Sequence, residues 1–301
     1  MSVVVNVLRS GDNSKPNPYT IAVIANPALE TPWRSSIFVG DPILNSLAAF
    51  QAAVVYIESN LFANLPGQKE KLLADLSIQP KVRLVSIFDD TLPADTGTSL
   101  VGQDDVSNIL VARRDAFAPH LAKYSIQADV AYAVSASPSH TRASAWFTSD
   151  DDTGAGVAFT LDGSEFSHRY NYAVPGTVAI HATASSLTAL HEFGHAASSY
   201  TNGAVHDLYV DSPTGLNNKV GRPIPPSFAD YEGTVYKSDL TRDGLGYPPG
   251  WRSFHCELLD PSCPAVMDNY FLSRSGALAC QHDAITRRFL RDRILAKIGR
   301  P

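Results

Sequence analysis

Two histidines separated by three residues, His191 and His195, constrain this chain more than any other feature of its sequence. On a helix, residues four apart lie about 40° apart around the axis and one turn above each other, so both imidazoles can reach one metal ion. Glu192 stands between them, close enough to act on a water molecule that the metal activates. This spacing is the H-E-x-x-H arrangement, in which the histidines bind Zn²⁺ and the glutamate serves as general base.

The flanking residues predict that this motif lies on a helix. Residues 183–200 carry apolar side chains at three-to-four-residue spacing, with serine or threonine near the start as an N-cap. Residues 201–203 contain an Asn-Gly pair suited to ending a helix, and residues 176–182 alternate like a strand that leads into it. The alternative is that both histidines are ordinary helix residues that bind nothing.

A third metal ligand must come from outside the helix, because a catalytic zinc ion usually has three protein ligands and an open fourth position. The nearest candidates are His206 and Asp207, just beyond the glycine turn. Adjacent residues of an extended segment point to opposite sides, so we expect only one of them to bind. Imidazole is the commoner zinc ligand and favours His206, but the residues alone leave the choice open.

Met267 is the only methionine besides Met1, and it lies in a short turn-like segment, residues 263–271. A motif helix, a glycine turn, a third polar ligand and a methionine-bearing turn together resemble the metzincin type of zinc peptidase. This resemblance implies that Met267 lies beneath the metal as an apolar floor and shapes the pocket without reacting.

The chain resembles more closely the IgA-peptidase-like family of metzincin-related enzymes, which carry H-E-F-G-H followed by an Asp-x-Tyr segment. The matching residues here are 191–195 and Asp207-Leu208-Tyr209, and the resemblance covers residues 177–285. It implies Asp207 as the third ligand, against the preference for His206 from zinc chemistry.

The sequence departs from the extended metzincin signature, which has glycine at the position of Ser198 and histidine at that of Thr201. The link from the motif to the third ligand is therefore longer here. Tyr270 follows Met267 by three residues rather than two. Tyr270 and Tyr209 are candidates for a transition-state or pocket role, and a packed ring with a solvated hydroxyl is the alternative for Tyr270.

Length, composition and charge limit the other functions that the chain can have. With 301 residues, of which 44% are hydrophobic, it can bury a large core as one domain or two lobes. A net charge of −6 without a basic patch argues against nucleic acid, and no apolar run is long enough to span a membrane. The first ten residues lack the features of a signal peptide, which predicts a cytoplasmic protein or non-classical secretion.

Alternating strand and helix patterns predict an α/β fold with a mixed twisted sheet and a central zinc-binding helix. The predicted strands are residues 19–25, 82–88, 128–135, 143–147, 156–161 and 169–173, besides the strand-like first ten residues. The predicted helices are residues 45–62, 68–76, 103–124 and 282–297. We expect an N-terminal α/β lobe, residues 1–203, and an irregular, loop-rich C-terminal lobe, residues 204–301, with a cleft between them that suits an extended substrate.

The sequence thus predicts a zinc-dependent hydrolase of peptide bonds in proteins or peptides, with Zn²⁺ as its cofactor. One alternative is a zinc hydrolase of a small amide, and another is a silent zinc-containing binding module, against which Glu192 argues. A second metal site from His282 and three cysteines is a further alternative, although the cysteines form no C-x-x-C pair. These cysteines are Cys256, Cys263 and Cys280.

Overall fold

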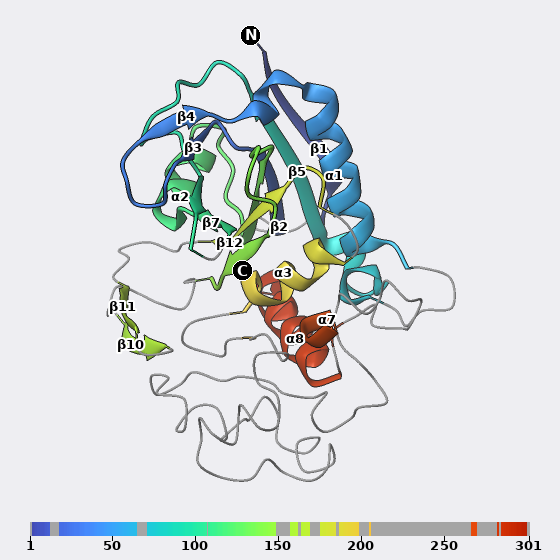
Figure 1. Cartoon of the computed structure of the whole chain (residues 1–301). Coiled ribbons are helices and arrows are strands. Elements are labelled where there is room, and N and C mark those ends of the chain that lie inside the picture. The colour runs from blue at the N-terminus through green and yellow to red at the C-terminus, as the bar shows by residue number, and fades with distance from the viewer. Residues whose placement is uncertain are drawn as a thin grey trace.

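A computed structural model of the chain shows an α/β fold (Figure 1). It describes residues 2–12, 18–64, 71–106, 108–148, 157–161, 164–168, 175–184, 187–198, 205, 266–269, 282 and 284–299. The predictions for His206, Asp207, Tyr209 and Tyr270, for the three cysteines and for the strand at 169–173 lie outside these residues.

A six-stranded mixed sheet forms the centre of the fold, which confirms the predicted α/β class. The strand order is β1 (Val3–Ser10), β5 (Val82–Asp89), β2 (Tyr19–Ala25), β8 (Val130–Ser135), β12 (Gly176–His181) and β9 (Ser144–Trp146). The four inner strands are parallel to one another, and the edge strands β1 and β9 pair antiparallel with β5 and β12. Parallel strands covered on both faces are apolar throughout, which is why these segments are recognisable in the sequence.

Alternate residues of the central strands belong to two separate cores. On one face, Ile21 and Val23 pack with α1 (Leu47–Phe62), α3 (Thr188–Ala196) and α8 (Ala284–Gly299). On the other face, Ala22 and Ile24 pack with a second sheet and α2 (Arg114–Ala122). The predicted helices at 45–62 and 282–297 are therefore confirmed to within a few residues.

The second sheet corrects the predicted helix at 103–124. Its strand order is β4 (Phe38–Gly40), β3 (Ala28–Glu30), β6 (Val101–Asp104) and β7 (Ile109–Ala112). The first half of the predicted helix is thus a β-hairpin, and only α2 is helical. The Asp104 carboxylate accepts the Val106 N–H (3.0 Å), and Asn108 has a φ of 54°, so local turn chemistry overrides the apolar periodicity.

The remaining elements are short. The predicted helix at 68–76 is wrong in its described part, where only a 3₁₀ turn, η2 (Leu72–Ala74), forms. Two further 3₁₀ turns are η1 (Pro42–Asn45) and η3 (Gln79–Lys81), and α7 (Val266–Asn269) is a single turn. Strands β10 (Val157–Leu161) and β11 (Ser164–His168) form an antiparallel pair.

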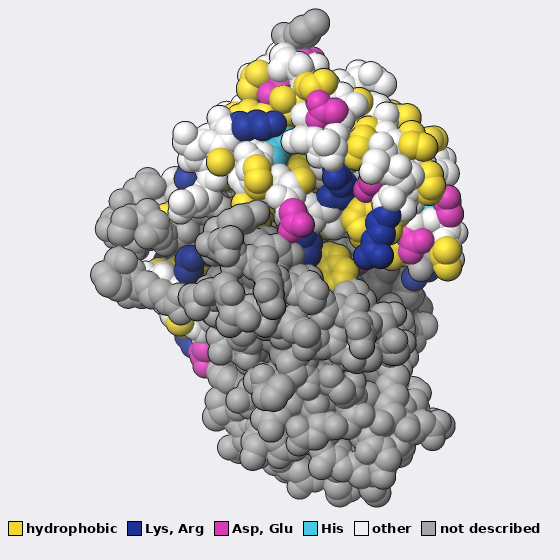
Figure 2. Space-filling model, turned by 90° about the vertical axis from the view of Figure 1, so that its left-hand side faces the viewer, with side chains coloured by type: hydrophobic (Ala, Val, Ile, Leu, Met, Phe, Trp, Pro, Cys, Tyr) yellow, Lys and Arg dark blue, Asp and Glu magenta, His cyan; other side chains and the backbone are white. Residues whose placement is uncertain are grey.

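The described surface mixes side chains of different kinds. In the view of Figure 2, basic and acidic side chains are interspersed with polar and apolar ones rather than gathered by sign. Within the described part of the chain, no helix has the length and apolar character that crossing a membrane requires.

Candidate metal site on helix α3

Helix α3 carries all three motif residues, and it is shorter than the predicted 183–200. It spans Thr188–Ala196, and its N-cap residue, Leu187, has no side-chain oxygen with which to accept the first free N–H groups. The expected serine or threonine N-cap is therefore wrong, because the residue at the N-cap position is Leu187.

Helix α1 supplies the missing acceptors at the start of α3. The Leu190 N–H donates to the side-chain oxygen of Asn60 (2.8 Å), and the Ala189 N–H points to the hydroxyl of Tyr56 at 3.4 Å. The first four N–H groups of any helix need partners outside it, and a buried one without a partner is costly. The start of α3 is thus fixed by a side chain 130 residues earlier in the chain.

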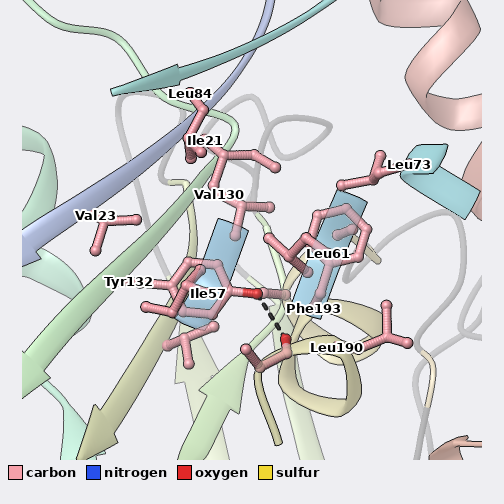
Figure 3. Close-up of a cluster of buried hydrophobic side chains, with 14 of the residues drawn as sticks. Ile21, Val23, Ile57, Leu61, Leu73, Leu84, Val130, Tyr132, Leu190 and Phe193 are labelled. Carbon is pink, nitrogen blue, oxygen red and sulfur yellow. Dashed lines mark hydrogen bonds between the residues drawn. The ribbon is translucent and has the colours of Figure 1, made fainter. Parts of the chain in front are cut away.

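The apolar side chains of α3 belong to the core that also contains residues of the central sheet and α1. Figure 3 shows Leu190 and Phe193 in one buried cluster with Ile57 and Leu61 of α1 and Tyr132 of β8. The Tyr132 hydroxyl donates to the Ala189 carbonyl (2.8 Å), a bond drawn as a dashed line in Figure 3.

At the other end of the helix, Gly176 of β12 lies directly under the Ala196 carbonyl. A Cβ added at Gly176 would lie 1.8 Å from that oxygen, well inside any tolerable contact. The glycine therefore allows the end of α3 to approach the strand closely, and both ends of the motif helix are fixed on the rest of the fold.

The two histidine rings lie side by side with their Nδ1 atoms on backbone carbonyls. Their centroids are 5.0 Å apart, and the ring planes are at 81° to each other. His191 Nδ1 lies 2.8 Å from the Val266 carbonyl oxygen, and His195 Nδ1 lies 2.6 Å from the Val205 carbonyl oxygen. A carbonyl can only accept, so each Nδ1 carries a hydrogen, and a ring that carries this one hydrogen has its lone pair on Nε2.

Glu192 is also largely buried, with 6% of its surface exposed. Burial raises the pKa of Tyr132 well above its usual value, and the nearby negative charge of Glu192 adds to this effect. The pKa of Tyr56 is raised for the same two reasons, which outweigh its hydrogen bonds to α3. Both tyrosines therefore stay neutral at physiological pH.

The structure brings Met267 to the motif helix. Met267 belongs to α7 and is fully buried, and its sulfur would lie 2.5 Å from a Cβ added at Gly194. The glycine inside the motif thus leaves the room that this methionine occupies.

His282 lies beside the site, whereas the sequence suggests a metal-binding role for it only together with the three cysteines. Its Nε2 would lie 2.8 Å from a Cβ at Gly194, and no hydrogen-bond partner for either ring nitrogen lies within the described residues. Burial, followed by the charges of His191 and His195, lowers the pKa of His282 to about 3. The Leu190 carbonyl raises the pKa of His282 in part, although its geometry falls short of a hydrogen bond. Nothing in the local sequence around His282 indicates this position.

The segment that leads to the predicted third ligand is fixed at one point, Val205. This residue is fully buried, and its N–H donates to the hydroxyl of Ser198 (3.0 Å) while its carbonyl holds His195. His206 follows directly, and Asp207 comes next, outside the described residues. Within the described ranges, no three His, Cys, Asp or Glu side chains are grouped as a metal ion requires.

Comparisons with known proteins give no relative for this chain. No family model, no curated protein sequence and no solved structure matches it. The function must therefore be argued from the geometry of α3 and its neighbours.

Proposed function

We propose that the chain is a zinc-dependent peptide hydrolase of the metzincin-like type, with proteins or peptides as substrates. The observation that supports this most strongly is the orientation of the two imidazoles. Zinc-binding histidines usually donate their second ring nitrogen to a carbonyl or carboxylate, which fixes the tautomer and aims the other nitrogen at the metal. His191 and His195 both have this arrangement, from carbonyls in two different segments.

The position of Val205 supports a third ligand at His206 or Asp207. The Val205 carbonyl holds the ring of His195, so the chain passes beside this ring immediately before these two residues. Imidazole and carboxylate both suit zinc, so either residue completes a three-ligand set. The described residues therefore fit a zinc ion in the nature and orientation of two donors.

Zinc bound to such ligands polarises a carbonyl oxygen and makes water a better nucleophile. In this proposal, Glu192 takes the proton from the attacking water and passes it to the leaving amine, as a general base that becomes a general acid. Tyr209 and Tyr270 stay candidates for contacts with the substrate.

Metal analysis and peptide cleavage test the proposal together. The purified protein is expected to contain about one zinc ion per chain, and His195→Ala to lose it. Glu192→Gln should keep the metal and lose turnover on a denatured protein mixture by several orders of magnitude, because only the base is removed. A Glu192→Gln variant with full activity would show that the mechanism is wrong. Full zinc content in His195→Ala would show that the assignment of His195 as a ligand is wrong.

A further inference from the structure

We propose that Ser198 is a positioning residue, which holds His195 in its metal-binding tautomer by fixing Val205. This inference rests on the proposed function and deepens it, because it names a residue outside the motif that sets the affinity for zinc. Ser198 lies three residues after His195, just beyond the end of α3, and is fully buried.

Three hydrogen bonds form a closed path that begins and ends at His195. The Ser198 hydroxyl donates to the His195 carbonyl (2.6 Å) and accepts from the Val205 N–H (3.0 Å). The Val205 carbonyl then accepts from the Nδ1–H of the His195 ring (2.6 Å). The backbone and the ring of the same histidine are thus tied to one hydroxyl.

The backbone of Ser198 brings a third segment to the same point. Its carbonyl accepts the Thr148 N–H (2.9 Å), just after edge strand β9. The neighbouring ring of Phe147 meets the ring of His195 edge-on, with centroids 6.5 Å apart. One side of the imidazole is therefore limited by Phe147, and its Nδ1 is held by Val205.

The position requires a group that donates and accepts at one point. A hydroxyl can do both, whereas glycine and alanine can do neither. Without the hydroxyl, the buried Val205 N–H loses its acceptor, and the carbonyl next to it is no longer held against the ring. His195 can then carry its hydrogen on Nε2, the tautomer that cannot bind a metal through that atom.

Zinc affinity, measured by competition with a chelator, tests the role of Ser198. Ser198→Ala should bind zinc about 10- to 100-fold more weakly than the wild type, as expected when a contact that orients a metal ligand is lost. Ser198→Cys should fall between the two, because a thiol keeps the volume but bonds weakly. If Ser198→Ala is too unstable to purify, the cysteine variant carries the test alone.

Ser99→Ala provides a matched control. Ser99 is also fully buried and donates to a backbone carbonyl, that of Val101 (3.2 Å), but its neighbours Leu100 and Val101 belong to the second core. This variant should lose some stability and keep its zinc affinity. If Ser198→Ala binds zinc as tightly as Ser99→Ala, the positioning role is refuted.

The tautomer of His195 can be measured without metal and provides a second test of the role of Ser198. In zinc-free protein with ¹⁵N-labelled histidines, NMR should show His195 as the Nδ1–H form in the wild type and in Ser99→Ala. Ser198→Ala should show a mixture of both tautomers. An unchanged Nδ1–H form in Ser198→Ala refutes the inference. A wild type that binds no zinc while its tautomer responds to Ser198→Ala refutes the proposed function and supports the positioning role.

Discussion

Gly194→Ala tests how closely Met267 and His282 approach the motif helix. In an open helix interior, replacing glycine by alanine stabilises a protein by about 1 kcal/mol. At Gly194, the new Cβ would lie 2.5 Å from the Met267 sulfur and 2.8 Å from His282 Nε2. Real Cβ contacts are longer than 3.0 Å, so both neighbours must move.

The effect of Gly194→Ala on stability depends on how easily Met267 and His282 can move. The methionine sulfur lies in a flexible side chain, whereas the His282 ring is enclosed on all sides. Overpacking a core costs about 1–3 kcal/mol, which equals or exceeds the gain of about 1 kcal/mol in helix propensity. We therefore expect Gly194→Ala to lower the free energy of unfolding by about 0–2 kcal/mol.

Urea unfolding of the zinc-free protein measures this difference, and Gly40→Ala is the control. A Cβ added at Gly40 has no atom within 4 Å, so this variant should be neutral or more stable by up to about 1 kcal/mol. In a double-mutant cycle, Met267→Ala should reduce the cost of Gly194→Ala, because it removes one of the two obstructions. If Gly194→Ala stabilises the protein as much as an unobstructed helix glycine allows, this packing is wrong.

Two further predictions concern the framework. Burial lowers the pKa of His120 to about 4 from the ordinary 6.5, so between pH 6.5 and pH 4 only the unfolded state takes up the proton. Stability should fall over that range by up to about 3 kcal/mol, and unfolding curves of His120→Leu should show a shallower pH dependence. Asn60→Ala removes the acceptor for the Leu190 N–H and should cost about 1–3 kcal/mol in thermal unfolding. Asn60→Asp keeps an acceptor and should cost less; equal losses in both variants would contradict the capping role.

The strands of the central sheet were predictable because buried parallel strands are continuous apolar runs. The hairpin of β6 and β7 was missed because its turn depends on Asp104 and Asn108, whose polar side chains interrupt the pattern without excluding a helix. In such a segment, a positive φ at one asparagine decides between the two structures, and apolar spacing does not report it.

The residues of the candidate site also divide into those that the sequence predicts and those that it does not. His191, Glu192 and His195 were recognisable because the helix geometry relates them locally. The groups that orient them were not, because the acceptors for Nδ1 are the backbone carbonyls of Val205 and Val266, and every residue has a carbonyl. His282 and Asn60 reach α3 only through tertiary packing, so their position in the sequence carries no sign of it.

The orientation of the two imidazoles is therefore a property of the whole fold. Helix α3 has nine residues, fewer than the about 12–15 that an isolated helix needs in water. Its start is held from α1, and its histidines are held from residues 10 and 75 positions further along the chain. In the proposed zinc site, any variant that loosens these contacts should weaken metal binding without replacing a proposed ligand. Affinities are therefore informative only between variants of similar stability, for which Ser99→Ala sets the reference for Ser198.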